Sequence, residues 1–157
     1  MKPLRIVAVL TAGLLAAAAV VFVAWNPATE KTVGASEAAS APLLEIRWHG
    51  GGIVLQGKVR DVATQQALAQ GAAARLGGET DQVTDWLDIT PTGLVVADPA
   101  ALAQLIRLGQ EGWHLQRRPA EARLAVQSLA DARSAQALSL LQAAFGPGVP
   151  ARLIQLP

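Results

Sequence analysis

An uncharged apolar stretch of 20 residues, from Ile6 to Trp25, constrains this 157-residue chain more than any other feature. At 1.5 Å per residue, a helix of that length spans roughly 30 Å, the thickness of the hydrocarbon core of a bilayer. The stretch therefore predicts a transmembrane helix over residues 6–25, after a short cytoplasmic segment, residues 1–5. The expected membrane-anchor residues are Ile6, Gly13, Phe22 and Trp25.

The basic residues around this stretch predict its orientation. Lys2 and Arg5 precede it, and the next basic residue is Lys31. By the positive-inside rule the N-terminus stays in the cytoplasm, which predicts a single-pass inner-membrane protein with its C-terminal part in the periplasm. A cleaved signal peptide is the alternative, although its apolar core is usually about 7–15 residues. Both interpretations export the rest of the chain.

Residues 26–42 have the composition of a flexible linker. They are small or polar, show no apolar periodicity, and contain a proline near each end. Seventeen such residues have a root-mean-square reach of roughly 20–25 Å. The linker therefore holds whatever follows it close to the membrane.

From Leu43 onward, alternating apolar residues and turn signals predict strands and helices. A hairpin with its turn at residues 50–52 precedes a helix that Asp61 caps, and a strand follows near residues 83–89. After a turn comes a helix capped by Asp98, with Gly109 on its apolar face. Strands near residues 113–116 and 124–126, a helix capped by Asp131, and a strand near residues 153–156 complete the chain.

The second part of this order repeats the first. Shifted by 70 positions, residues 59–78 align with residues 129–148, and Asp61 matches Asp131. The repeat predicts two related units, residues 43–97 and 98–157. Each unit of about 45 residues in ordered elements buries little by itself, so we expect each to need its sibling or a partner.

The residues around the first helix cap resemble a known family. Residues 53–61, Ile-Val-Leu-Gln-Gly-Lys-Val-Arg-Asp, are similar to the entry into the second helix of the BON domain. This small repeat occurs in OsmY-like periplasmic proteins and ahead of the OmpA-like module in some OmpA-family envelope proteins. In the second unit Ser128 stands in place of the motif's glycine. The residues of the fold signature are Leu55, Gly57, Val59, Asp61 and Asp131.

The resemblance implies an α+β fold, here two small αββαβ-type units after the transmembrane helix. It also implies a location in the cell envelope and a non-catalytic role in binding phospholipid or an envelope protein. The alternative function is a structural or assembly subunit of an inner-membrane complex, and a homo-oligomer is a further candidate partner. The formal net charge of +1 does not favour a nucleic-acid partner.

Catalytic and metal-binding motifs are weak in this chain. There is no cysteine, and the two histidines, His49 and His114, lack further ligands nearby in the sequence. Residues 52–58 spell G-x-x-x-x-G-K, but valine follows where a phosphate loop needs Ser or Thr. A hydrolase interpretation depends only on the acidic cluster of Glu79, Asp81, Asp85 and Asp88. We therefore expect no enzyme, no cofactor and no metal site.

The two predicted units carry opposite charges. Residues 43–98 hold four basic and seven acidic side chains, a net charge of −3. Residues 99–157 hold six arginines and three carboxylates, a net charge of +3. Arg117, Arg118 and Arg123 fall on a predicted hairpin of the basic unit. They are the candidate contacts for anionic lipid or for a protein partner.

Overall fold

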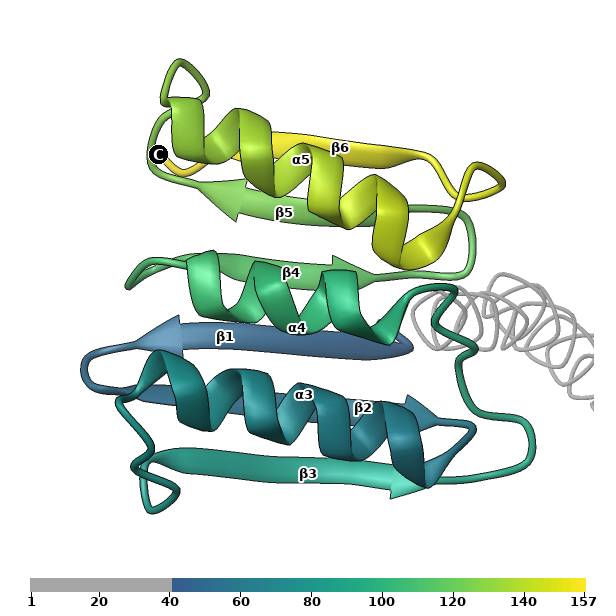
Figure 1. Cartoon of the computed structure of the whole chain (residues 1–157). Helices are drawn as coiled ribbons and strands as arrows, with labels where there is room; N and C mark the ends of the chain where they lie inside the picture. The colour runs from purple at the N-terminus through teal and green to yellow at the C-terminus, as the bar shows by residue number, and fades with distance from the viewer. Residues whose placement is uncertain (1–40) are drawn as a thin grey trace, which may run out of the picture. The chain divides into compact units, whose positions relative to one another are not determined.

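A computed structural model describes residues 41–157, which form one mixed sheet with three helices (Figure 1). The transmembrane helix expected at residues 6–25, with its anchor residues, and nearly all of the linker lie outside the described residues. Among the helices that are described, none has both the length and the apolar character needed to cross a bilayer.

The elements follow one another in an order that occurs nearly twice. The first group is β1 (Leu44–His49), β2 (Gly52–Val59), α3 (Val62–Arg75) and β3 (Val83–Ile89). The second group is α4 (Pro99–Leu108), β4 (His114–Arg117), β5 (Ala122–Val126), α5 (Ala132–Phe145) and β6 (Ala151–Gln155).

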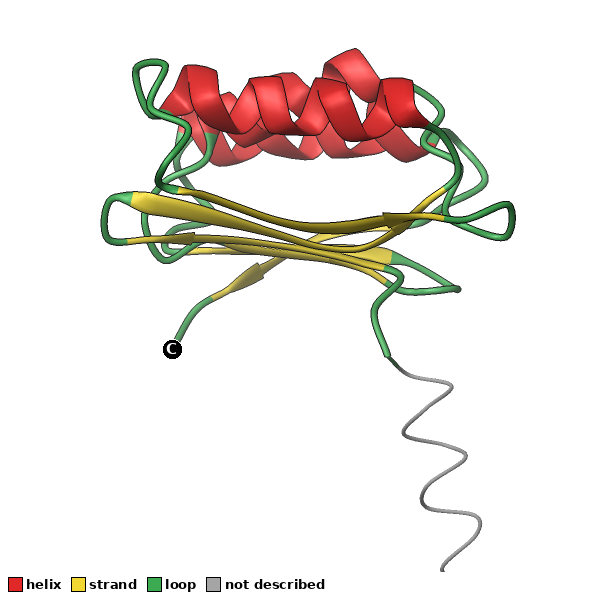
Figure 2. Ribbon diagram, turned by 90° about the horizontal axis from the view of Figure 1, so that it is seen from below, coloured by secondary structure: helices red, strands yellow, loops and turns green. Residues whose placement is uncertain are grey.

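The six strands form a single sheet in the order β3-β2-β1-β4-β5-β6. The four inner strands, β2, β1, β4 and β5, pair with one another antiparallel, whereas each outer strand is parallel to the strand beside it. A parallel neighbour requires a crossover, and α3 and α5 supply it within each group. Figure 2 shows all three helices on one face of the sheet.

Aspartates begin the three helices because their carboxylates accept the free amides of the first turn. Asp61 accepts a hydrogen bond from the Thr64 amide at 2.7 Å, and Asp98 accepts one from the Ala101 amide at 3.0 Å. Asp131 caps α5 in the same way. Of the other signature residues, Leu55 and Val59 are fully buried beneath the helices, and Gly57 has a φ of +144°.

The expectation of a fold made of two small αββαβ-type units is wrong. The structure has one six-stranded mixed sheet, and the first group lacks a leading helix. The cause is that a single group of these elements would be unstable by itself. It would leave β1 or β4 as an unpaired edge strand, and it would bury too little apolar surface in its core. Pairing of β1 with β4 removes both edges, and α4 packs between α3 and α5. Buried residues of both groups therefore form one continuous core.

Candidate functional site

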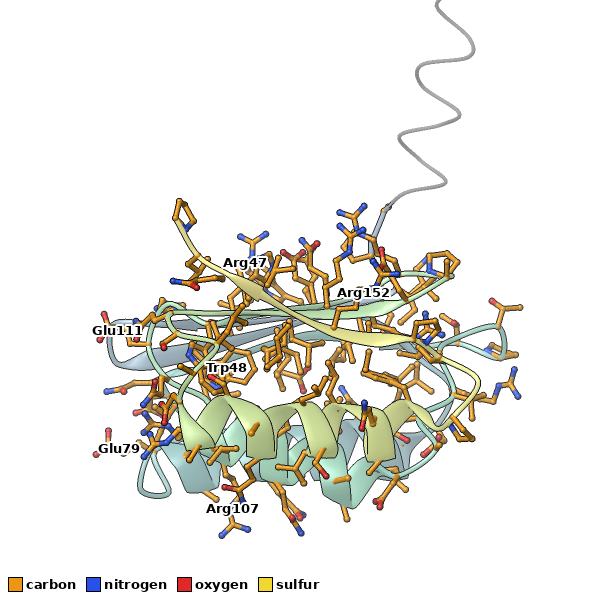
Figure 3. All side chains as sticks on the ribbon, turned by 90° about the horizontal axis from the view of Figure 1, so that it is seen from above. Arg47, Trp48, Glu79, Arg107, Glu111 and Arg152 are labelled. Carbon is orange, nitrogen blue, oxygen red and sulfur yellow. The ribbon has the colours of Figure 1, made fainter. Side chains whose placement is uncertain are left out.

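The sheet has one face without helices, which we call the open face (Figure 2). Because side chains alternate along a strand, every second residue lies on this face. Figure 3 shows Arg47 and Arg152 on the side of the sheet away from the helices, and Trp48 between sheet and helices. By register, the open face consists of Thr84, Trp86, Asp88, Val54, Gln56, Lys58, Glu45, Arg47, His49, His114, Gln116, Arg123, Ala125, Arg152 and Ile154.

A carboxylate lies beneath basic groups at the centre of the open face. The side chain of Glu45 is only 11% exposed, and its Oε1 accepts hydrogen bonds from Arg47 Nη2 at 2.6 Å and Nε at 2.8 Å. His114 of the neighbouring strand β4 places Nε2 2.5 Å from the same oxygen. Since an ionised carboxylate only accepts, the imidazole is the donor in this contact.

The surroundings of Glu45 keep it ionised. Burial by itself raises the pKa of this carboxyl. The hydrogen bonds from Arg47 and His114, together with their positive charges, outweigh burial and hold the pKa of Glu45 below its ordinary value. The cluster is therefore a charged, hydrogen-bonded centre at physiological pH.

A second carboxylate is arranged in the same way near the β4–β5 turn. Arg123 forms an ion pair with Glu121, and Arg152 of β6 places Nε 3.8 Å from the other carboxylate oxygen. The hydrogen bond from Arg123 and the nearby positive charges lower the pKa of Glu121. Its side chain is 16% exposed, whereas those of Arg123 and Arg152 are 42% and 69% exposed. On this part of the face the guanidinium groups are outermost.

Exposed apolar side chains flank the basic groups. Trp86 on β3 is 63% exposed and lies opposite Gln56 of β2 in the parallel register. Ile154 on β6 is 45% exposed. Trp86 and Ile154 stand on the two outer strands, so the charged centre of the open face has an apolar side chain towards each edge.

The three candidate arginines of the hairpin do not lie together. Arg117 points towards the helices, is 8% exposed, and stacks over the Phe145 ring at 5.6 Å from the centroid. Burial lowers its pKa, and among residues 41–157 neither its Nε nor its Nη1 has a hydrogen-bond partner. Arg118 donates to Gln116 Oε1 at 3.2 Å, on the side of Arg123. Strand alternation separates Arg117 from the other two.

Three basic residues of the open face escaped the sequence prediction. These are Arg47, Lys58 and Arg152. Arg47 alternates with the buried Ile46 and Trp48, and Arg152 alternates with the half-buried Ala151 and Leu153. That alternation was the available signal, but sequence alone does not say that the faces of six strands are joined into one surface.

The acidic cluster is divided between the two sides of the sheet. Asp85 faces α3, where its Oδ2 accepts a hydrogen bond from Gln65, and Asp88 is on the open face. The phosphate-loop-like residues 52–58 are the regular strand β2. Among residues 41–157, no group of three or more His, Asp or Glu side chains is placed to hold a metal ion.

We predict that Glu45→Gln destabilises the fold in a pH-dependent way. The folded-state pKa of Glu45 is lowered, so the carboxylate contributes stability above its unfolded pKa of about 4.3 and loses it as the pH falls through the folded value. The substitution should therefore cost about 1–2 kcal/mol at pH 7 and less at pH 3, because the carboxylate becomes protonated as the pH falls. Denaturant unfolding of both chains at the two pH values measures this. The exposed Asp88→Asn is the control, and an equal cost of Glu45→Gln at both pH values would contradict the prediction.

Comparison with known proteins adds no relative: no family model, no curated protein and no solved structure matches the chain. The resemblance of residues 53–61 to the BON domain therefore stays a prediction.

Proposed function

We propose that residues 41–157 form a non-catalytic binding module that places its open face on the anionic headgroups of a phospholipid bilayer. The observation that carries the proposal is the depth of the charged groups on this face. The paired carboxylates lie closer to the sheet than the arginine side chains that contact them. Glu45 and Glu121 lie low, at 11% and 16% side-chain exposure, beneath the arginines that pair with them. An approaching surface therefore meets cations before it meets carboxylates.

The number of exposed cations favours a charged membrane surface. Arg47, Lys58, Arg123 and Arg152 are exposed or half-buried on the open face, against two carboxylates, the exposed Asp88 and the half-buried Glu121. Each basic side chain near an anionic bilayer contributes about 1 kcal/mol at most, and the contribution falls off within a Debye length. Binding of this kind should weaken steeply as the salt concentration rises.

The exposed tryptophan supports the same partner. Trp86 is 63% exposed beside the basic centre, and indole rings favour the headgroup region of a bilayer. The predicted inner-membrane localisation of the chain, which depends on residues 6–25, would keep this face within reach of a bilayer. An assembly subunit, the alternative function, would bind protein instead, and it also stays a prediction.

The helix side provides a matched comparison. Arg75, Arg107 and Arg133 line a shallow cavity of about 420 Å³ on the helices, so both sides of the domain carry basic groups. Arg75 is held there by a 2.9 Å hydrogen bond from Nε to the carbonyl of Gly109. In the part of the chain that the structure describes, the helix-side arginines have no exposed aromatic side chain beside them, which is why we assign the bilayer to the open face.

Environment-sensitive labels on the full chain test the proposal. The chain has no cysteine, so Gln56→Cys labels the open face and Gln136→Cys labels the outer surface of α5. In nanodiscs containing phosphatidylglycerol, we expect the fluorescence emission of a label at residue 56 to shift to shorter wavelength. Brominated lipid should quench this emission. The label at residue 136 should not change. Nanodiscs of phosphatidylcholine alone should leave both labels in water.

Charge reversal distinguishes the two sides. Lys58→Glu/Arg152→Glu should abolish the signal at residue 56, whereas Arg107→Glu/Arg133→Glu, with the same change in net charge, should preserve it. A signal at residue 136 in place of residue 56, or equal signals on neutral and anionic bilayers, would overturn the proposal.

A further inference from the structure

The two outer edges of the sheet differ in how their backbone is protected. An edge strand has a row of N–H and C=O groups without a neighbouring strand, which is a template for pairing with another chain. We call these the β3 edge and the β6 edge (Figure 1). Proteins usually protect such edges, and among residues 41–157 side chains protect part of only one of these two.

Side chains cap the middle of the β3 edge, at Leu87. Ile53 N donates to Gln82 O, and Thr90 N donates to Val59 O. The N–H and C=O groups of the even-numbered residues of β3 therefore point towards β2. The N–H and C=O groups of Leu87, an odd-numbered residue, therefore point away from β2, towards the outside of the sheet. Its amide donates to Asp85 Oδ1 at 3.0 Å, and its carbonyl accepts from Gln65 Nε2 at 3.3 Å.

The β6 edge has no such caps among residues 41–157. The bonds between Ala122 N and Pro150 O and between Leu156 N and Val126 O place the even-numbered backbone groups of β6 towards β5. The outward groups then belong to Ala151, Leu153 and Gln155, and no side chain donates to them or accepts from them.

Two sequence differences leave the β6 edge open. Gln65 is four residues after the Asp61 cap of α3, and the corresponding residue of α5, four after Asp131, is Ala135. On β6 the helix-facing residues are Ala151, Leu153 and Gln155, so no carboxylate takes the place of Asp85. Both side chains of the cap are therefore missing from the second group.

We infer that the β6 edge is a docking site for an extended, acidic segment of a partner protein, which adds a seventh strand to the sheet. Backbone hydrogen bonds give affinity in this mode, and alternate side chains give specificity. On the open face the added strand meets Arg152, which is 69% exposed. On the helix side it meets Leu153, which is packed partly against the core. The matching segment alternates acidic and apolar residues.

Charge favours an acidic partner over a second copy of this chain. Residues 99–157, which include β4, β5 and β6, carry six arginines and three carboxylates. Pairing of two β6 edges would bring two such regions of net charge +3 together, and like charges across an interface are unfavourable. The β6 edge therefore fits a negatively charged strand better than it fits itself.

Synthetic peptides and hydrogen exchange on the full chain test this inference. The probes are two capped eight-residue peptides that alternate valine with glutamate or valine with lysine. We expect the glutamate peptide to slow exchange of the amides in residues 151–155 and to leave residues 83–89 unchanged. The lysine peptide should have little effect on either strand.

Three variants make the test specific. Gln155→Pro removes an outward N–H without affecting the pairing with β5, and it should abolish binding at an edge that tolerates proline. Arg152→Glu should reverse the preference from the glutamate peptide to the lysine peptide. Gln65→Ala/Asp85→Ala should remove the side-chain caps of the β3 edge. Peptide binding should then also slow amide exchange at residues 83–89.

Each contrary outcome overturns the inference. Equal binding of both peptides, protection at β3 in the unmodified chain, or an unchanged preference in Arg152→Glu would show that the β6 edge is not an acidic-strand site. Protection of residues 151–155 that depends on protein concentration without peptide would assign the β6 edge to a second copy. Lys58→Glu, a charge change remote from β6, should leave peptide binding intact, so this result is independent of the bilayer experiment.

Discussion

Gly109→Ala is expected to destabilise the fold by about 4 kcal/mol, although it adds a single methyl group. A Cβ at this position would overlap the indole ring of Trp48 at its Cε2 and Nε1 atoms. That ring is held in position, because Nε1 donates to the Ile106 carbonyl at 2.9 Å and the ring makes a T-shaped contact with Trp113, with centroids 6.4 Å apart. Overpacking costs about 1–3 kcal/mol, and the loss of a buried hydrogen bond costs about 1–3 kcal/mol more.

A double-mutant cycle identifies the cause. Gly109 has a φ of −55°, which alanine adopts readily, so the cost is steric and not conformational. Trp48→Leu removes the overlapping atoms, and Gly109→Ala in that background should cost less than about 1 kcal/mol. Gly148→Ala is the control, because a Cβ there meets nothing within 4 Å. Denaturant unfolding gives the free energy of unfolding of the four chains of the cycle: the unmodified chain, the two single variants and the double variant. Additive costs of the two substitutions would show that Trp48 is not responsible.

Local pattern was sufficient to predict the individual elements. Alternation of Leu44, Ile46 and Trp48 with polar residues indicated β1, and the aspartate caps of the helices are visible in the sequence. The local prediction for Gly109 was wrong: the sequence places it on the apolar face of a helix, whereas α4 ends at Leu108 and Gly109 is its C-cap. This C-cap position needs a glycine because the Trp48 ring occupies the space where a side chain would be.

The local sequence pattern could not predict how the elements assemble into one sheet. The pairing of β1 with β4 joins residues about 70 positions apart, and no spacing or turn residue specifies it. Without that pairing, the two groups look like separate units, and Arg117 looks like part of an exposed hairpin with Arg118. Once β4 is central, the register Leu44↔Arg117 places Arg117 on the core side. The open face and the difference between the two edges follow from the same non-local pairing.

Gly57→Ala is expected to cost about 3 kcal/mol or more, because this signature glycine has both an unusual backbone conformation and a close neighbour. Its φ of +144° is a conformation that residues with a Cβ rarely adopt. A Cβ would also lie 2.9 Å from the Leu44 Cα and 3.2 Å from the Leu43 carbonyl carbon. Leu44 is its partner on β1, so the overlap would separate β1 from β2 at the end of their hairpin that lies away from the turn.

Gly77→Ala separates these two contributions. Gly77 also has a positive φ, +72°, but a Cβ there meets nothing within 4 Å, so only the conformational cost of about 1 kcal/mol applies. Denaturant unfolding should rank Gly57→Ala at least twice as destabilising as Gly77→Ala. Hydrogen exchange should show the additional loss of protection at Lys58, whose amide donates to the Leu43 carbonyl at 3.1 Å. Equal costs for the two variants would mean that β1 can move away from Gly57, and that the glycine serves backbone conformation alone.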